Sequence, residues 1–164
     1  MRTLLLAVLA AGAVLLALVL QPAERKTGAA AVTGARLVRI PRRAVRRLEL
    51  SLGQQEVVAL STDDGWTVDG RPTDPAMKAA LDDLTDALVG LRAVDQFRGT
   101  IQQSFGFDPP RGSIVVGSQR RTVRLLLGAF TATTATLYAR REGDPRVFQI
   151  GTYLLAAIGR VLDR

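Results

Sequence analysis

Two side-chain types that commonly carry out catalysis are missing from this sequence of 164 residues. It contains neither histidine nor cysteine, so the usual general base near neutral pH and the commonest metal ligand are absent, and no disulfide can form. The sequence also lacks the phosphate-binding P-loop, the dinucleotide-binding glycine motif, the hydrolase nucleophile elbow and the zinc-protease motif. We therefore expect neither a metal nor a cofactor.

Two pairs of adjacent carboxylates remain as candidates for acid–base chemistry. Asp63 and Asp64 precede Gly65 in a predicted turn, and Asp82 and Asp83 fall on the polar face of a predicted helix. An acid–base couple needs one carboxyl group whose pKa is raised by burial, whereas exposed carboxyl groups keep pKa values near normal. The sequence therefore predicts that the protein is not an enzyme.

Arginine supplies the most concentrated charge in the sequence. The formal net charge is +7, and 20 of the 22 cationic side chains are arginine. Such a balance can indicate nucleic acid, an anionic membrane surface or an acidic partner, although a GC-rich coding sequence produces the same arginine preference without any ligand. Six arginines fall within twelve residues that contain no acid, and they form the candidate contact with an anionic surface: Arg36, Arg39, Arg42, Arg43, Arg46 and Arg47.

Two interpretations of this cluster remain open. An anionic leaflet attracts each nearby Lys or Arg by about 1 kcal/mol, within a Debye length of the surface, so the cluster could lie against a membrane. It could equally be a solvated strand edge and turn that charge protects from aggregation. Nucleic acid is not an expected partner, because base stacking needs exposed rings and only 5% of the residues are aromatic.

An uncharged apolar run from Thr3 to Leu20 precedes the polar part of the chain. As a helix its eighteen residues would extend about 27 Å at ~1.5 Å per residue, close to a hydrocarbon core of about 30 Å. We expect a transmembrane signal anchor over residues 1–20. A cleavable signal peptide is the competing interpretation, but the run is long for one and the following segment, QPAERK, lacks a clean cleavage site.

The orientation of this anchor depends on two opposing observations. Arg25, Lys26, Arg36 and Arg39 follow the run, against Arg2 and the amino terminus before it, and this count alone favours a cytoplasmic domain. A leading apolar segment with a two-residue tail more commonly directs the following chain across the membrane. We therefore expect a single-pass protein of the cell membrane whose domain faces the periplasm or the cell exterior.

The remaining sequence divides into a linker and one domain. Residues 21–35 carry small and polar residues without a sustained period, which is typical of a flexible linker, and the folded domain is expected over residues 36–164. Apolar or alternating runs predict strands at 36–41, 46–52, 56–61, 66–68, 113–117, 121–128, 135–141 and 145–151. The FGFDPP segment between them predicts a turn, because Gly106 permits a sharp bend and Pro109-Pro110 blocks a helix or central strand.

Two helices complete the pattern. Asp74 as N-cap and Pro75 at the first helical position open the first, whose apolar stripe is Met77, Leu81, Leu84, Leu88 and Leu91. The second, over residues 152–162, can bury Leu154, Leu155, Ile158 and Leu162. The order of elements predicts an α+β fold: a mainly antiparallel sheet with one long and one C-terminal helix packed on it, preceded by a single N-terminal transmembrane helix.

The order of these landmarks resembles the family catalogued as domain of unknown function 4340, over about Arg36 to Ile150. The residues that carry the resemblance are Trp66, Asp74-Pro75-Ala76, Phe105-Gly106-Phe107-Asp108-Pro109-Pro110, Leu127-Gly128, Tyr138-Ala139-Arg140 and Val147-Phe148. The resemblance implies a membrane-anchored extracytoplasmic accessory component, sometimes associated with ABC transporters of the gliding-motility type, with no catalytic residues to carry over. Family members often repeat this unit, and the present sequence holds one copy.

We therefore expect a membrane-anchored, non-catalytic accessory or interaction domain with an integral-membrane protein as partner. The alternative is a secreted or periplasmic binder of a polyanionic ligand, which the arginine-rich face would contact. Five aromatic residues are expected in the core rather than in a site, because buried aromatics carry large contact areas: Trp66, Phe105, Phe107, Tyr138 and Phe148.

Overall fold

The computed structural model describes residues 34–98, 105–132 and 135–163, which all fall within one compact unit, Val32–Arg164. The predicted anchor from Thr3 to Leu20 and residues 21–33 of the predicted linker lie outside the described residues. Within the part of the chain that is described, no helix is long and apolar enough to cross a membrane.

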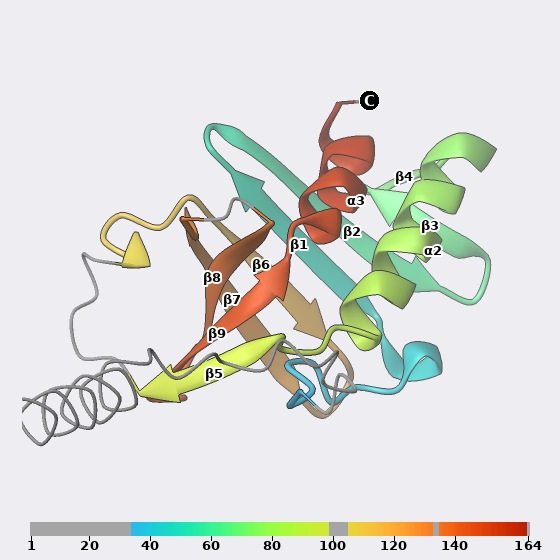
Figure 1. Cartoon of the computed structure of the whole chain (residues 1–164). Coiled ribbons are helices and arrows are strands. Elements are labelled where there is room, and N and C mark those ends of the chain that lie inside the picture. Colours follow the sequence, from blue (N-terminus) through green and yellow to red (C-terminus); the bar gives the residue numbers. More distant parts are fainter. Residues whose placement is uncertain (1–33, 99–104, 133–134, 164) are drawn as a thin grey trace, which may run out of the picture. The chain divides into compact units, whose positions relative to one another are not determined.

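The described strands form one nine-stranded sheet (Figure 1), in which every neighbouring pair is antiparallel. Its strand order is β4-β3-β2-β1-β6-β7-β8-β9-β5. The bounds are β1 (Arg47–Leu52), β2 (Gln55–Thr62), β3 (Gly65–Val68), β4 (Arg71–Pro72), β5 (Asp95–Arg98), β6 (Gly112–Gly117), β7 (Thr122–Phe130), β8 (Thr136–Arg141) and β9 (Arg146–Gly151). The mainly antiparallel α+β fold predicted from the sequence is therefore confirmed for the described domain.

Two meanders make up the sheet and meet where β1 pairs with β6. The first runs from β1 to β4 and the second from β6 to β9, and their junction places Leu48 opposite Val116 and Leu50 opposite Ile114. The connection from the first meander to the second passes through a helix and β5, which pairs with β9 at the far edge. Residues distant in sequence are thus brought together at the β1–β6 junction.

Two helices, α2 (Pro75–Val89) and α3 (Tyr153–Leu162), lie side by side against the sheet (Figure 1). The predicted cap of α2 is confirmed, because the Asp74 side chain accepts a hydrogen bond of 2.7 Å from the Met77 N–H and Pro75 occupies the first helical position. The helix ends at Val89 rather than at Leu91, and Leu91 is buried just beyond its end.

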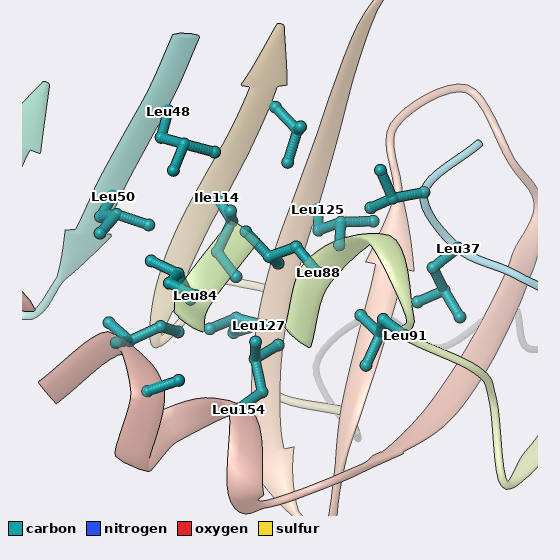
Figure 2. Packing of buried hydrophobic residues seen from close by; sticks show 14 of the residues in the cluster. Leu37, Leu48, Leu50, Leu84, Leu88, Leu91, Ile114, Leu125, Leu127 and Leu154 are labelled. Carbon is teal, nitrogen blue, oxygen red and sulfur yellow. The ribbon is translucent and has the colours of Figure 1, made fainter. Parts of the chain in front are cut away.

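The core fills the space between the helices and one face of the sheet. Because side chains alternate between faces along a strand, every second residue of the central strands joins it, and Figure 2 shows these residues meeting Leu84 and Leu88 from α2 and Leu154 from α3. Burying each such leucine contributes roughly 1.5–3 kcal/mol. The strand residues concerned are Leu48, Leu50, Ile114, Leu125 and Leu127, none more than 1% exposed.

The strand predicted at residues 36–41 is wrong. Arg36 makes only an isolated bridge to Arg92. Beside it, the Leu37 N–H donates to the Leu91 carbonyl at 3.2 Å. A single 3₁₀ turn, η1 (Arg42–Ala44), follows. The apolar residues of this segment are nevertheless buried, namely Leu37, Val38 and Ile40. Their apolar pattern therefore reflects side chains that a loop contributes to the core and not membership of the sheet.

The predicted core aromatics divide between the two faces of the sheet. Trp66, Phe107 and Phe148 are buried as expected, whereas Phe105 and Tyr138 are half-buried. Tyr138 lies between the core residues Leu137 and Ala139 in β8 and so points away from the helices, with its ring centroid 5.0 Å from that of Phe105. The prediction of a core position is thus confirmed for Trp66, Phe107 and Phe148 and wrong for Phe105 and Tyr138.

The segment around Phe105 and Phe107 passes directly over Gly128 in β7. A Cβ atom added at Gly128 would lie 2.1 Å from the Phe105 carbonyl oxygen, and Gly106 adopts a positive φ of 71° as the chain bends there. The predicted turn is confirmed. Two landmarks far apart in the sequence, FGFDPP and Leu127-Gly128, are therefore one packing unit.

Candidate anion-binding site

The structure divides the six arginines predicted to contact an anionic surface into two groups. Arg39, Arg43 and Arg46 line one hollow of about 610 Å³. Arg36, Arg42 and Arg47 do not line it. The hollow, not the whole run from residue 36 to 47, is therefore the candidate site.

The three arginines outside the hollow are placed elsewhere. Arg36 lies at the bridge to Arg92, the Arg42 guanidinium pairs with Asp86 and with Asp82, and the Arg47 guanidinium pairs with Glu49. Arg47 also begins β1, which lies between β2 and β6 in the sheet. The cluster is therefore not a strand edge, which corrects that part of the second interpretation drawn from the sequence.

The turn between β6 and β7 contributes two further arginines to the hollow, Arg120 and Arg121. They were missed in the sequence because residues 117–121 resemble an ordinary polar turn, and only the non-local pairing of β1 with β6 reveals their position. Since Gly117 pairs with Arg47, this turn lies beside the segment that leads into β1. Ser118 and Gln119 from the same turn, and Ile40, Pro41 and Ala44 from the facing segment, complete the lining.

The segment that carries Arg39, Arg43 and Arg46 is held from several sides, and we call it the first wall of the hollow. The Arg46 N–H donates to the Gly117 carbonyl at 2.8 Å, and the Arg46 carbonyl accepts from the Ser61 N–H at 2.9 Å. Ile40 and Val45 are each only 3% exposed and fasten the segment to the core. The backbone of this wall is consequently tied to β2, to β6 and to the core.

The turn over residues 118–121 forms the second wall and is closed by its own hydrogen bonds. The Ser118 N–H donates to the Arg121 carbonyl at 2.8 Å. The Ser118 Oγ accepts from the backbone N–H groups of Arg121 at 3.0 Å and Arg120 at 3.3 Å. This serine therefore sets the turn geometry and leaves both guanidinium groups available to the hollow.

The charges around the hollow are almost entirely uncompensated. Arg46 reaches Asp63 at 3.9 Å, and the Asp63 side chain is itself fully exposed. The other four guanidinium groups form no ion pair with any described residue, and no carboxylate lines the hollow. A guanidinium has only donors, and it recognises carboxylate and phosphate oxygens through paired N–H groups, so the arrangement suits an oxyanion.

The carboxylate pairs considered for acid–base chemistry lie in different surroundings. Asp63 and Asp64 are exposed in the turn before β3. Asp82 accepts from Lys78 Nζ at 2.8 Å and from Trp66 Nε1 at 3.1 Å, and the Lys78 hydrogen bond is the main reason that its pKa lies below the usual value, against an opposing effect of burial. That direction is the opposite of the raised pKa a general acid requires.

A metal site can also be assessed within the described ranges. No group of three or more Asp, Glu, His or Cys side chains there is close enough together to hold a metal ion. Arginine is the charged side-chain type that lines the hollow.

Comparison with known proteins gives one match. The family model described as domain of unknown function (DUF4340) matches residues 66–162, which is more than half of the chain and extends from β3 through α3. No curated protein and no solved structure matches the chain. The second wall of the hollow lies within the matched range, and the first wall precedes it.

Proposed function

The chain belongs to the DUF4340 family, and on that basis we propose that it is a membrane-anchored, non-catalytic accessory domain that binds an integral-membrane protein. The apolar run from Thr3 to Leu20 would hold it in the cell membrane with the domain on the periplasmic or outer side. The resemblance described above implies an ABC transporter of the gliding-motility type as the class of partner. The resulting molecule is an auxiliary component of a membrane-protein complex.

The arginine-lined hollow is the observation that carries this proposal. Its charged groups are guanidinium groups, which stay protonated in proteins and donate hydrogen bonds without accepting them. Such groups can hold an anionic partner group, but they are poorly suited to exchanging protons with a substrate. A site of this composition therefore supports binding rather than catalysis.

Purification of the full chain from detergent-solubilised membranes tests the proposal. We expect an integral-membrane protein to be recovered with it in stoichiometric amount. A matched control carries an unrelated transmembrane helix in place of residues 1–20 and should recover the same partner, because the domain makes the contact. If the full chain is recovered alone after mild solubilisation and cross-linking, the accessory role is wrong.

A secreted or periplasmic binder of a polyanion is the second candidate. The four guanidinium groups of the hollow that form no ion pair with a described residue favour it. In this case the mature chain would begin after Leu20 and would be found in the soluble fraction. It would be retained on heparin and released by salt, because each neutralised anionic group releases counterions. Replacing Arg39, Arg43, Arg120 and Arg121 with Ala should abolish the retention. A chain that still fractionates with membranes contradicts this candidate.

A further inference from the structure

We propose that the hollow is a specific site for one phosphate group, carried as an ester on a larger molecule and held between its two arginine walls. Arg39, Arg43 and Arg46 would contact it from the first wall, and Arg120 and Arg121 from the second. This inference goes beyond the proposed function, because it holds whether or not the domain binds a membrane protein.

Pairing with acids separates the arginines outside the hollow from those that line it, and this contrast distinguishes the hollow from an ordinary solvated face. Arg42 and Arg47 belong to the same run as Arg43, yet both are paired with acids. Arg39 and Arg43 have no such partner among the described residues, and the turn at 120–121 adds two more unpaired charges to the same space. Like charges within about 10 Å repel one another at ordinary ionic strength, and a bound anion would remove that repulsion.

The geometry favours phosphate over carboxylate. A guanidinium group binds two oxygens at once through a planar fork, and a carboxylate has only two oxygens, which one fork can occupy. A phosphate ester presents oxygens in several directions and can engage forks from both walls together. The arrangement of arginines on two facing segments therefore matches a tetrahedral anion.

The size and lining of the hollow indicate that the phosphate is part of a larger molecule. Its volume of about 610 Å³ lies within the roughly 300–1,000 Å³ that is usual for small-molecule sites. Pro41 and Ala44 add apolar surface beside the arginines, where the carbon portion of an ester can pack. The backbone of both walls is already fixed by hydrogen bonds, so binding has mainly to order side chains.

A phosphate ester could come from a lipid headgroup or from a soluble molecule. The predicted linker of residues 21–35 separates Leu20 from the domain. A chain covers up to about 3.3–3.6 Å per residue when extended, so a headgroup can lie within reach of the hollow. The chemistry that the hollow recognises is the same in both cases. The experiment therefore measures the phosphate site first and its source second.

Titration of the full chain with pyrophosphate tests the site, in micelles of dodecyl maltoside because this detergent carries no phosphate. Calorimetry should show saturable binding of one pyrophosphate per chain. The double variant Arg43→Gln/Arg120→Gln should bind about tenfold more weakly or worse, since it removes charge-assisted hydrogen bonds from both walls. The matched control Arg36→Gln/Arg71→Gln loses the same charge from exposed positions outside the hollow and should stay within about twofold of the parent.

Two further measurements test whether the variants stay folded and whether the planar guanidinium groups matter. The substituted side chains have no ion-pair partner among the described residues, so thermal unfolding followed by circular dichroism should be unchanged in every variant. The variant Arg43→Lys/Arg120→Lys keeps the charge but loses the planar forks, and it should bind several-fold more weakly than the parent. Absence of saturable binding, or an equal loss in the control variant, would overturn the proposal.

Protection of arginines from phenylglyoxal identifies the source of the phosphate. If headgroups occupy the hollow, nanodiscs of phosphatidylglycerol should protect Arg43 and Arg120, while Arg71 reacts as it does in micelles. If a soluble ester is the ligand, only added pyrophosphate should protect them. Protection by neither contradicts the site, whereas failure to recover a membrane-protein partner would contradict only the proposed function.

Discussion

Asp144 is the only buried carboxylate among the described residues, and two arginines hold it in the turn between β8 and β9. Its oxygens accept hydrogen bonds from Arg141 at 2.8 Å and from the Arg146 guanidinium at 2.7 and 2.9 Å, with a fourth bond from the Arg146 N–H at 3.0 Å. Chiefly because of the Arg146 side chain, the pKa of Asp144 lies far below its usual range, although burial acts in the opposite direction.

Replacement of Asp144 with Asn should lower the free energy of unfolding by about 1–3 kcal/mol at pH 7, since it weakens hydrogen bonds to charged groups in a buried place. A carboxyl group with a pKa lower in the folded than in the unfolded state stabilises the fold above its unfolded pKa, about 3.9. That stabilisation is lost as the pH falls through the folded pKa. The difference in the free energy of unfolding between the variant and the parent should therefore become smaller below about pH 4.

Urea unfolding of both proteins from pH 7 down to about pH 2 measures how this free-energy difference changes with pH. The change follows the titration of the Asp144 carboxyl group. The control is Asp64→Asn, at an exposed position, and it should change the free energy of unfolding by less than about 0.5 kcal/mol at pH 7. A difference for Asp144→Asn that stays constant with pH would mean that packing, not charge, explains the effect.

Three of the five arginines in the candidate site could be predicted from the sequence. Arg39, Arg43 and Arg46 belong to a local run of charge that is visible by inspection, whereas Arg120 and Arg121 are more than 70 residues away from it. The pairing of Arg42 with Asp86, which lies 44 residues later, could not be predicted from the sequence either. Local composition can reveal which charges a segment carries, but the tertiary fold decides which of them are neutralised.

Among the elements, β7 and the loop over it depend on the absence of a side chain at Gly128. A Cβ atom there would lie 2.1 Å from the Phe105 carbonyl oxygen and 3.0 Å from the Phe107 ring. Gly128→Ala should therefore destabilise the domain by about 1–3 kcal/mol, as overpacked positions commonly do. Chemical unfolding of the purified chain measures the change.

The same substitution in α3 provides a control of opposite sign. Gly159 is helical, and the nearest atom to an added Cβ is Asp163 Oδ2 at 3.6 Å, an ordinary contact distance. Gly159→Ala should stabilise the domain by up to about 1 kcal/mol, because alanine favours the helix. If Gly128→Ala were as stable as the parent, the close approach of the loop to β7 would be wrong.

The helices and strands could be predicted where the spacing of their apolar residues was regular. The alternation of Leu48 and Leu50 and the helical stripe through Leu81, Leu84 and Leu88 each depend on burial of one face. The strand β5 was missed because DQFR is short and polar, and only its pairing with β9 makes it a strand. The order of strands across the sheet, with β5 beside β9, depends on contacts that no local pattern encodes.

For the molecule as a whole, the side of the membrane on which the proposed anchor places the domain would decide which partners it can meet. We expect trypsin added to intact cells, or to spheroplasts where an outer membrane is present, to cut the predicted linker at Arg25 or Lys26 and release the domain. The reason is that a leading apolar segment with a short tail more commonly sends the following chain across the membrane. Immunoblotting with an antibody against the domain would follow the released fragment.

A cytoplasmic marker protein must remain intact in the same samples, which shows that the membrane is sealed. A domain that becomes sensitive to trypsin only after lysis would place it in the cytoplasm, in agreement with the count of positive charges after the apolar run. In that case the periplasmic or external location must be abandoned.

The outermost strands of the sheet bear on how copies of the domain would meet if, as proposed, each is anchored in a membrane. β4 is only two residues long and includes Pro72, which has no N–H to offer, and β5 carries Asp95 and Arg98. Short, charged or proline-containing borders resist the joining of one sheet to another. Copies anchored in a membrane would meet one another far more often than copies in solution. The borders of the sheet would then keep such encounters from growing into fibrils.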